Sequence, residues 1–321
     1  MPCVLFEWAK VAKNTFSSKI NYINKPREFP DESDKKFNER RQELVSQLEK
    51  FISTHELFAD KEVSIEFAHT GVSSLVCFIA TNQKKFVLKV PLKLPPQEGE
   101  VEFLKAWGSV GVSVPHVLME GKIGGHSYML YEYIDAPLLT DAIKSKKVGS
   151  NIYVEMGRVL KKMHLSKAQG YGHIVSGKPQ YHTFKEWLCG EDVQKRIKVV
   201  AEANILNEEE HGSIAIAQEI LLDYCKDDTV STYCHFDFGT SNILATDPLT
   251  VFDPFPLLSN WVIDIGRTIQ LMSSSPENIE KLKNGYFDET FYDKKALQAS
   301  VLLSAYMKFY HWYRANKKTP I

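Results

Sequence analysis

The sequence has no apolar run that approaches the ~18 residues of a membrane-spanning helix. Its opening residues, MPCVLFEWAK, carry charged residues early and lack the layout of a secretory leader. The chain also has no excess of charge of either sign, because 39 Lys and Arg face 40 Asp and Glu. General nucleic-acid binders are usually basic. We therefore expect neither a membrane nor a nucleic acid as a partner.

Paired cysteines are absent as well. The five cysteines are scattered and include no C-x-x-C pair: Cys3, Cys77, Cys189, Cys225 and Cys234. This odd, dispersed set disfavours a disulfide framework and a zinc site, and it favours a reducing, cytoplasmic location. The motif G-x-x-x-x-G-K-[ST] is also missing, which disfavours a P-loop enzyme.

The chain has 321 residues, enough for two lobes with a sizeable core. Residues 32–58 carry Phe37, Leu44, Leu48 and Phe51 at helical spacing. They predict a helix within an N-terminal extension over residues 1–60.

From residue 62 the pattern changes to short β-rich runs: VSIEFAH, LVCFIAT and KKFVLKV. The segment QEGEVEFLKAW then predicts a helix, and two further strands meet at Gly124-Gly125. Short turns between successive strands predict an antiparallel meander. We expect a small lobe of about five strands and one helix over residues 61–134.

Residues 135–321 predict a larger helical lobe. Apolar residues recur at helical spacing in four segments: NIYVEMGRVLKKMHL, FKEWL, IAIAQEILLDYC and ALQASVLLSAYMKFYHWYR. A small antiparallel-sheet lobe followed by a helical lobe is an α+β arrangement, and it predicts the bilobal layout of a protein kinase-like fold.

The tract YCHFDFGTSNILATDPLTVFDPFP, residues 233–256, predicts a strand, a turn at Asp247-Pro248 and a second strand. It brings Asp237, Asn242 and Asp253 into one short segment. Phosphoryl transfer needs one carboxylate at the acceptor hydroxyl, and an amide oxygen and a second carboxylate to hold Mg²⁺ on nucleotide phosphates. The alternative is ordinary turn chemistry, since Asp and Asn are common in turns.

Lys89 lies among apolar neighbours in FVLKV, which predicts a strand buried on both faces or nearly so. A buried lysine is costly unless it is paired. The following helix offers Glu98, Glu100 and Glu102, and Glu100 shares the face of Leu104, one turn later. We predict that Glu100 pairs with Lys89, whose ammonium would meet the phosphates of ATP. The alternative is that Lys89 reaches solvent at the strand end.

The turn HTGVSSLV offers further phosphate contacts. Gly71 would let the backbone approach closely, and Ser73 and Ser74 would add hydroxyl and amide donors. The alternative is a tight hairpin with no ligand.

Three residues are assigned supporting or structural roles. Asp264 is expected to brace the backbone of the 233–256 tract, or else to sit at a helix N-terminus and favour the dipole. His235 is expected to support the loop through hydrogen bonds. His164, at a helix end, is interpreted as a cap or packing residue.

These motifs resemble those of the aminoglycoside phosphotransferase and choline kinase-like family. HFDFGTSNIL is similar to its H-x-D-x-x-x-x-N loop, FVLKV to its strand lysine and YMLYEYID to its interlobe linker. VFDPFP and VIDIGR resemble its metal and bracing aspartates. The tract at 235–244, with GYG at 170–172, is most similar to the hygromycin phosphotransferase branch.

The resemblance implies a role for each matching residue. Asp237 would be the catalytic base, and Asn242 and Asp253 would ligate Mg²⁺. Lys89 would hold the ATP phosphates with Glu100 positioning it. The backbone of Glu132, Tyr133 and Ile134 would bind adenine. The chain departs from the pattern at Phe236, where the family usually has a small residue and protein kinases have arginine, and at Pro254 after Asp253.

The expected function is therefore ATP- and Mg²⁺-dependent transfer of the γ-phosphate to a hydroxyl of a small molecule. The acceptor could be an aminoglycoside-like antibiotic, with a role in resistance, or a related metabolite. An inactive pseudokinase that serves as a binding module and a protein kinase are the alternatives. Carboxylates that could receive an aminoglycoside are Glu186, Glu191, Asp192 and the run Glu208 to Glu210.

Overall fold

The computed structural model describes residues 19–26, 35–58, 60–69, 74–92, 99–203, 206–225, 228–288 and 290–316. The chain divides into two compact units. The first unit comprises Met1–Pro96 and His116–Tyr133, and the second comprises Gln97–Pro115 and Ile134–Ile321.

The first unit is a mainly antiparallel sheet with one long helix. Its elements are β1 (Lys19–Tyr22), α1 (Lys35–Thr54), β2 (Glu62–Phe67), β3 (Ser74–Thr81), β4 (Lys85–Pro91), β5 (Val117–Ile123) and β6 (His126–Glu132). The strand order is β1-β2-β3-β4-β6-β5. The antiparallel pairing of β2, β3 and β4 confirms the predicted meander. β1, which the sequence did not reveal, adds to β2 in parallel.

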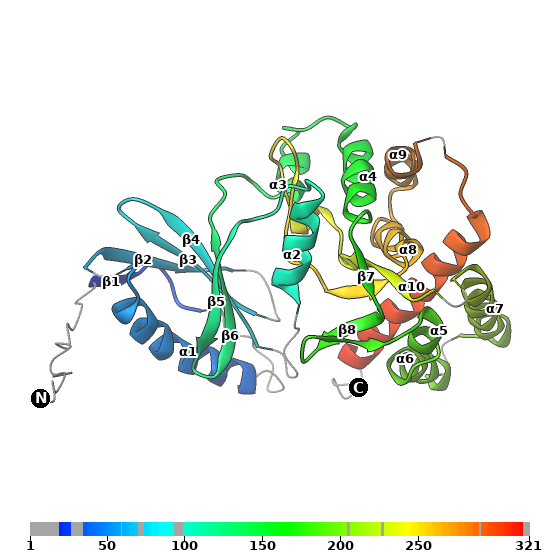
Figure 1. Cartoon of the computed structure of the whole chain (residues 1–321), viewed down its shortest axis with the longest axis horizontal. Coiled ribbons are helices and arrows are strands. Elements are labelled where there is room, and N and C mark those ends of the chain that lie inside the picture. The colour runs from blue at the N-terminus through cyan, green and yellow to red at the C-terminus, as the bar shows by residue number, and fades with distance from the viewer. Residues whose placement is uncertain are drawn as a thin grey trace, which may run out of the picture. The chain divides into compact units, whose positions relative to one another are not determined.

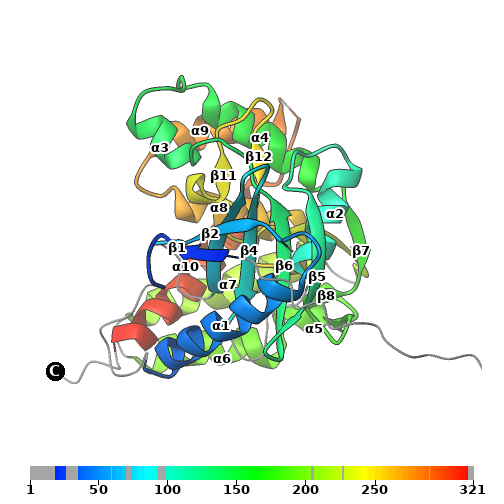
Figure 2. The same ribbon diagram turned by 90° about the vertical axis from the view of Figure 1, so that its left-hand side faces the viewer.

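One face of this sheet forms the core of the first unit. Alternate residues along β2, β3 and β4 are buried, as in Phe86, Leu88 and Val90 of β4, because successive side chains point to opposite faces. Leu44 and Leu48 of α1 belong to the same buried cluster, and Figures 1 and 2 show α1 lying across the sheet. The predicted N-terminal helix is thus part of the core of this unit.

The second unit is mainly helical, as expected, and contains a second sheet. Its helices are α2 (Glu100–Ser109), α3 (Leu139–Lys144), α4 (Ile152–Met163), α5 (Phe184–Leu188), α6 (Glu191–Glu202), α7 (Glu208–Cys225), α8 (Trp261–Leu271), α9 (Pro276–Phe287) and α10 (Lys294–Asn316). Its strands are β7 (Lys167–Gln169), β8 (Tyr171–Val175), β9 (Lys178–Tyr181), β10 (Val230–Cys234), β11 (Ile243–Leu244), β12 (Thr250–Val251) and β13 (Leu257–Ser259).

Five of these strands form a sheet in the order β7-β10-β13-β8-β9. The sequence analysis did not predict this sheet. Its strands are three to five residues long, too short to show a period. β11 and β12 form the predicted hairpin, with Ile243 opposite Val251 and Leu244 opposite Thr250.

Helix α2 differs from the expected organisation, because it belongs to the second unit. The indole Nε1 of Trp107 donates to the carbonyl of Tyr233 at 3.0 Å, and the ring of Phe103 contacts Tyr233 edge to face. Ser166 donates to the carbonyl of Ala106 at 3.0 Å. α2 is thereby attached to β10, the strand that leads into the 235–242 loop.

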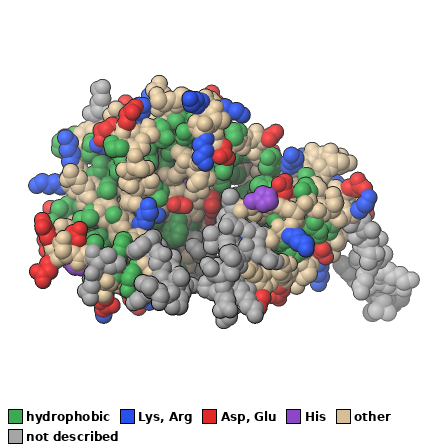
Figure 3. All heavy atoms as spheres, turned by 180° about the vertical axis from the view of Figure 1, so that it is seen from behind, with side chains coloured by type: hydrophobic (Ala, Val, Ile, Leu, Met, Phe, Trp, Pro, Cys, Tyr) green, Lys and Arg blue, Asp and Glu red, His purple; other side chains and the backbone are tan. Residues whose placement is uncertain are grey.

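The described surface carries no dominant charge. Figure 3 shows side chains of both signs scattered over one face, with no continuous patch of one sign among its described residues. None of the described helices is long and apolar enough to cross a membrane.

Candidate active site

The candidate site begins where β10 ends at Cys234 and the chain turns sharply through Phe236. Phe236 has a φ of 57°, a left-handed conformation that costs an L-residue roughly 1–2 kcal/mol. Two bonds hold it there: its N–H donates to Asp264 Oδ1 at 2.7 Å, and Arg267 Nε donates to its carbonyl at 3.3 Å. The next residue, Asp237, is only partly buried, so the turn presents its carboxylate at the surface of the second unit.

Asp264 braces this turn, as predicted. Its fully buried carboxylate also accepts from the N–H of His235 at 2.7 Å, through Oδ2. A carboxylate that takes two neighbouring backbone N–H groups forms charge-assisted hydrogen bonds, which are among the stronger ones in proteins. The expected alternative, a simple helix-end carboxylate, does not account for these two bonds.

The brace extends to a histidine and a tyrosine. His164 Nε2 lies 3.0 Å from Asp264 Oδ2, and its Nδ1 lies 2.7 Å from the hydroxyl of Tyr286. Burial raises the pKa of Tyr286 well above its usual value, so its hydroxyl keeps the proton and donates it to Nδ1. Nε2–H is then left to donate to Asp264. His164 is therefore a link in the brace, and its interpretation as a cap or packing residue was incomplete.

The side chains of His164, Cys234 and Asp264 offer potential metal ligands within 4.8 Å of one another. However, both oxygens of Asp264 already accept hydrogen bonds. Burial also raises the pKa of Cys234, so its thiol stays protonated. The cluster therefore acts as a hydrogen-bonded support and not as a cation site.

His235 supports the loop, as predicted, in a defined tautomer. The N–H of Asp237 donates to Nδ1 of His235 at 3.3 Å, so Nδ1 carries no proton. The proton of the neutral ring is therefore on Nε2, which donates to the carbonyl of Phe252 at 3.1 Å. Burial lowers the pKa of His235, although Asp264 and Asp237 oppose the shift. The ring stacks on Trp107 of α2, with centroids 5.5 Å apart and planes 3° apart. A buried neutral imidazole in this position holds the loop in place.

Asn242 locks the side chain of Asp237. A single 3₁₀ turn spans Thr240–Asn242. From it, Asn242 Nδ2 donates to Asp237 Oδ2 at 3.0 Å and to its carbonyl at 2.8 Å. Both partners are pure acceptors, so the amide nitrogen must face Asp237, which fixes the amide orientation. Oδ1 of Asn242 then faces elsewhere and accepts no hydrogen bond from the described residues.

Asp253 lies at the far end of the hairpin. The N–H of Phe252 donates to the carbonyl of Asn242 at 3.1 Å, which ties the end of the hairpin to the loop. Asp253 itself has a φ of 53° and an exposed side chain. The structure thus brings Asp237, Asn242 and Asp253 into one connected loop and hairpin of the second unit.

The predicted nucleotide ligands of the first unit lie on its sheet. Lys89 is on β4, between Val76 of β3 and Met129 of β6. The strand was expected to be buried on both faces or nearly so; it is buried on the core face, and Lys89 and Val87 on the opposite face are half-buried. Ser74 begins β3, and its carbonyl accepts from Arg41 at 3.2 Å. Ser73 and Gly71 lie outside the described residues.

Glu100 is buried on α2, on the same side as Leu104, whereas Glu102 is exposed and accepts from the hydroxyl of Tyr233 at 2.9 Å. Glu98 lies outside the described residues. Because Glu100 and Lys89 belong to different units, their pairing stays a prediction.

The segment expected to bind adenine follows β6. Glu132 ends that strand, and the N–H of Tyr133 donates to the carbonyl of Lys85 at 3.3 Å. The carbonyl of Ile134 accepts from the N–H of Ala136 at 2.9 Å. The nucleotide contacts of these three residues stay predictions.

Several carboxylates proposed for an aminoglycoside have structural partners. Glu186 accepts from the N–H of His182 at 2.7 Å and completes a capping box with Thr183 at the start of α5. Glu210 accepts from the N–H of Asn207 at 2.8 Å. These two side chains cap helices. Asp192 lines one pocket of the second unit, and Glu210 lines another.

Comparisons with known proteins are consistent with this geometry. A sequence model described as the phosphotransferase enzyme family matches residues 64–255. No curated protein sequence matches the chain significantly.

Similar folds occur among solved structures. One is a thermostable mutant of an aminoglycoside phosphotransferase in ternary complex with AMP-PNP and hygromycin B, with a TM-score of 0.61 and 15% identity over 85% of this chain and 93% of that one. Another is spectinomycin phosphotransferase with ADP and spectinomycin, with a TM-score of 0.59 and 15% identity over 84% and 87%. A choline/ethanolamine kinase family protein from Mesorhizobium loti has a TM-score of 0.58 and 16% identity over 86% and 89%.

Proposed function

Since the chain belongs to the phosphotransferase enzyme family, we propose that it transfers the γ-phosphoryl group of ATP to a hydroxyl of a small molecule. The observation that carries this proposal is the bond between Asn242 Nδ2 and Asp237 Oδ2 at 3.0 Å. It orients a partly exposed carboxylate on a loop that Asp264 braces from beneath. The nucleotide complexes of similar structures support ATP as the donor.

The oxygens of this loop suit Mg²⁺, which prefers carboxylate and carbonyl oxygens together with substrate phosphates. The hydrogen bond from Asn242 to Asp237 uses Nδ2 of the amide and not Oδ1. Asp253 presents an exposed carboxylate. We propose these two residues as the protein ligands. When bound, Mg²⁺ would neutralise charge on the nucleotide phosphates.

Asp237 acts on the acceptor in this proposal. The acceptor oxygen attacks the γ-phosphorus, and the bond from that phosphorus to the β–γ bridging oxygen breaks. ADP leaves, and the hydroxyl proton passes to the Asp237 carboxylate. Positioning contributes most of the rate enhancement in this chemistry. The brace through Asp264 therefore matters as much as the carboxylate itself.

The first unit supplies the remaining contacts. Lys89, with Glu100 as its partner, would hold the ATP phosphates, Ser73 and Ser74 would add donors, and the backbone over residues 132–134 would receive adenine. The half-buried position of Lys89, on the face of its sheet opposite the core, supports this role.

A product screen tests the proposal. The protein is incubated with ATP and Mg²⁺ and with a panel of hydroxyl compounds, and phosphorylated products are detected by mass. The proposal predicts at least one product that wild type forms and Asp237→Asn does not, while Asp247→Asn, an exposed aspartate of the hairpin turn, forms it normally. Equal product from Asp237→Asn and wild type would contradict the assignment.

A further inference from the structure

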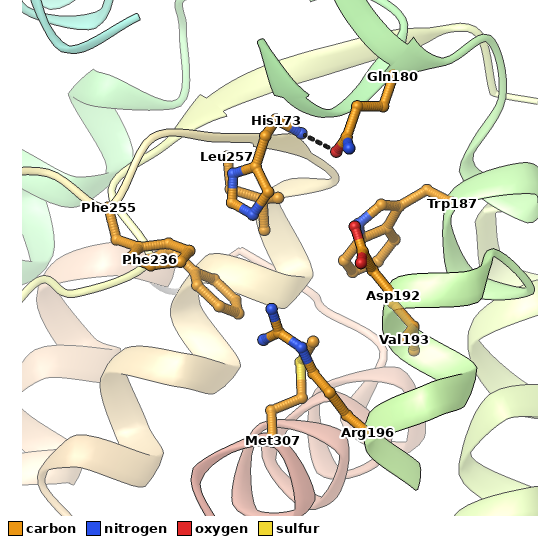
Figure 4. Close-up of a pocket in the computed structure, with 10 residues that line it drawn as sticks. All are labelled: His173, Gln180, Trp187, Asp192, Val193, Arg196, Phe236, Phe255, Leu257 and Met307. Atoms are coloured by element: carbon orange, nitrogen blue, oxygen red, sulfur yellow. Dashed lines mark hydrogen bonds between the residues drawn. The ribbon is translucent and has the colours of Figure 1, made fainter. Parts of the chain in front are cut away.

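A pocket in the second unit borders the proposed catalytic loop. Phe236 lines it directly before Asp237, and Phe255 lines it two residues after Asp253. Its other walls come from β8, β9, α5, α6, β13 and α10. The lining residues, which Figure 4 shows as sticks, are His173, Gln180, Trp187, Asp192, Val193, Arg196, Phe236, Phe255, Leu257 and Met307.

Most of this lining is apolar or aromatic, and its one arginine is Arg196. Figure 4 shows the guanidinium of Arg196 pointing into the pocket, among the side chains of His173, Phe236 and Met307. Within the described part of the chain, this guanidinium donates no hydrogen bond and forms no ion pair. The guanidinium lies beside the ring of Tyr310, with 5.8 Å between Cζ and the ring centroid.

The electrostatics of the pocket leave this cation poorly compensated. Burial lowers the pKa of Arg196, and Asp192, four residues earlier on α6, offsets the effect only in part. A guanidinium has five N–H donors, and a cation that is withdrawn from water is costly unless it gains a partner. An anionic group entering the pocket would supply that partner.

The size of the pocket limits what enters it. The open space is about 20 Å³, close to that of a single water molecule. It therefore suits a small terminal group and not a sugar ring. The rest of an acceptor would lie outside this space, and Asp237 directly follows the lining residue Phe236 in the chain.

We propose that the acceptor is an anion: it places a carboxylate on Arg196 while its hydroxyl meets Asp237. This inference rests on the proposed function and names its substrate class, a small hydroxy acid. It departs from the expectation of an aminoglycoside, since the guanidinium of Arg196 points into the pocket, whereas Asp192 is exposed. A carboxylate and a guanidinium form two parallel hydrogen bonds, which would fix the orientation of the acceptor.

Binding experiments without ATP test this class directly. Three probes share a benzyl alcohol and carry an anionic, a neutral or a cationic para substituent: para-hydroxymethylbenzoate, para-methylbenzyl alcohol and para-hydroxymethylbenzylamine. Their dissociation constants are measured by NMR titration of the full chain. We expect the carboxylate to bind most tightly of the three probes. Arg196→Met, which keeps an apolar stem, should raise the dissociation constant of the carboxylate about ten- to a hundredfold, because it removes a charge-assisted hydrogen bond. Arg196→Lys should retain part of the preference.

Lys195→Met is the matched control, because Lys195 is the exposed neighbour on the same helix, and it should leave the constants unchanged. The inference is overturned if wild type binds the carboxylate no tighter than the alcohol or the amine. It is also overturned if a folded Arg196→Met variant, checked by circular dichroism, binds the carboxylate as wild type does.

Phosphorylation of cationic acceptors alone would refute the anionic class and leave the proposed transfer intact. A chain that binds the carboxylate through Arg196 but phosphorylates no hydroxyl compound would refute the transfer instead.

Discussion

Asp264 Oδ1 accepts a 2.7 Å hydrogen bond from the N–H of Phe236, a residue held at a φ of 57°. This bond joins α8 to the residue before the proposed catalytic base. A bulky side chain in the left-handed region is uncommon, and it persists where surrounding contacts over-determine it. The position of Asp237 thus depends on a buried carboxylate that lies 28 residues after Phe236 in the chain.

We predict that Asp264→Asn lowers both stability and turnover. An amide cannot replace a carboxylate that accepts from two N–H groups and from His164. The free energy of unfolding should fall by about 2–3 kcal/mol, and kcat by roughly a hundredfold as Asp237 is misplaced. Urea titration and steady-state kinetics measure these changes, with the exposed Asp141→Asn as the control. Unchanged kcat in a folded Asp264→Asn protein would contradict the bracing role.

The brace should weaken by a smaller amount when Tyr286 loses its hydroxyl. In Tyr286→Phe, Nδ1 of His164 loses its donor, which should cost about 1–2 kcal/mol of unfolding free energy. Asp264 keeps its backbone bonds, so kcat should fall less than in Asp264→Asn. Tyr153→Phe is a suitable control, because that hydroxyl makes no hydrogen bond to the described residues. A Tyr286→Phe protein as stable as wild type would show that this link contributes nothing.

How much of this could be predicted from the sequence depends on how local each feature is. The meander of β2 to β4 and the β11–β12 hairpin follow from runs of alternating or apolar residues and turn residues, and the structure confirms them. Asp264 was predicted as a brace because VIDIGR resembles the segment that carries the family's bracing aspartate. The strand of Lys89 was expected to be buried on both faces or nearly so, because the neighbours of Lys89 in the sequence are apolar. Which face forms the core depends on the packing of α1 against the sheet, and the local sequence does not show this packing.

Other features depend on contacts between distant segments. The pairing of β1 with β2 and the second sheet join short strands with no period of their own. The attachment of α2 to β10 rests on Trp107 and Tyr233, 126 residues apart. A lone histidine at the end of α4 gave no sign that His164 would reach Asp264, 100 residues later. Such tertiary contacts leave no mark in a local pattern.

The buried neutral His235 should make stability depend on pH. Its pKa is lowered in the folded chain, whereas the unfolded chain binds a proton near the ordinary value of about 6.5. As pH falls below that value, the unfolded state binds more protons than the folded state, so the free energy of unfolding falls. The fall continues until the folded pKa is passed, at up to about 1.4 kcal/mol per pH unit.

Urea titrations between about pH 7 and pH 5 compare wild type with His235→Asn, which cannot titrate. The variant should be less stable at pH 7 but should lose less stability on acidification. Parallel pH profiles for the two proteins would rule out this contribution of His235.

Asp253 should matter for Mg²⁺ and not for the fold. Asp253 and the control residue Asp288 are both exposed and both have positive φ, so Asp253→Ala should change the free energy of unfolding no more than Asp288→Ala does. Mg²⁺-dependent binding of a nonhydrolysable ATP analogue should weaken on the order of tenfold or more, because Mg²⁺ sites use few carboxylates. Calorimetry with and without Mg²⁺ measures this effect. Asp288→Ala, at an exposed aspartate that also has positive φ, is the control, and equal effects of the two substitutions would remove Asp253 from the metal site.

The most direct test of the central claim compares phosphoryl transfer with nucleotide binding in Asp237→Ala. With an acceptor found by the product screen, the account predicts that the rate of transfer falls by roughly 10²–10⁴-fold, the usual contribution of a positioned base. The Kd for the ATP analogue should stay close to that of wild type, since Asp237 is assigned to the acceptor. Wild-type transfer by Asp237→Ala would contradict the account.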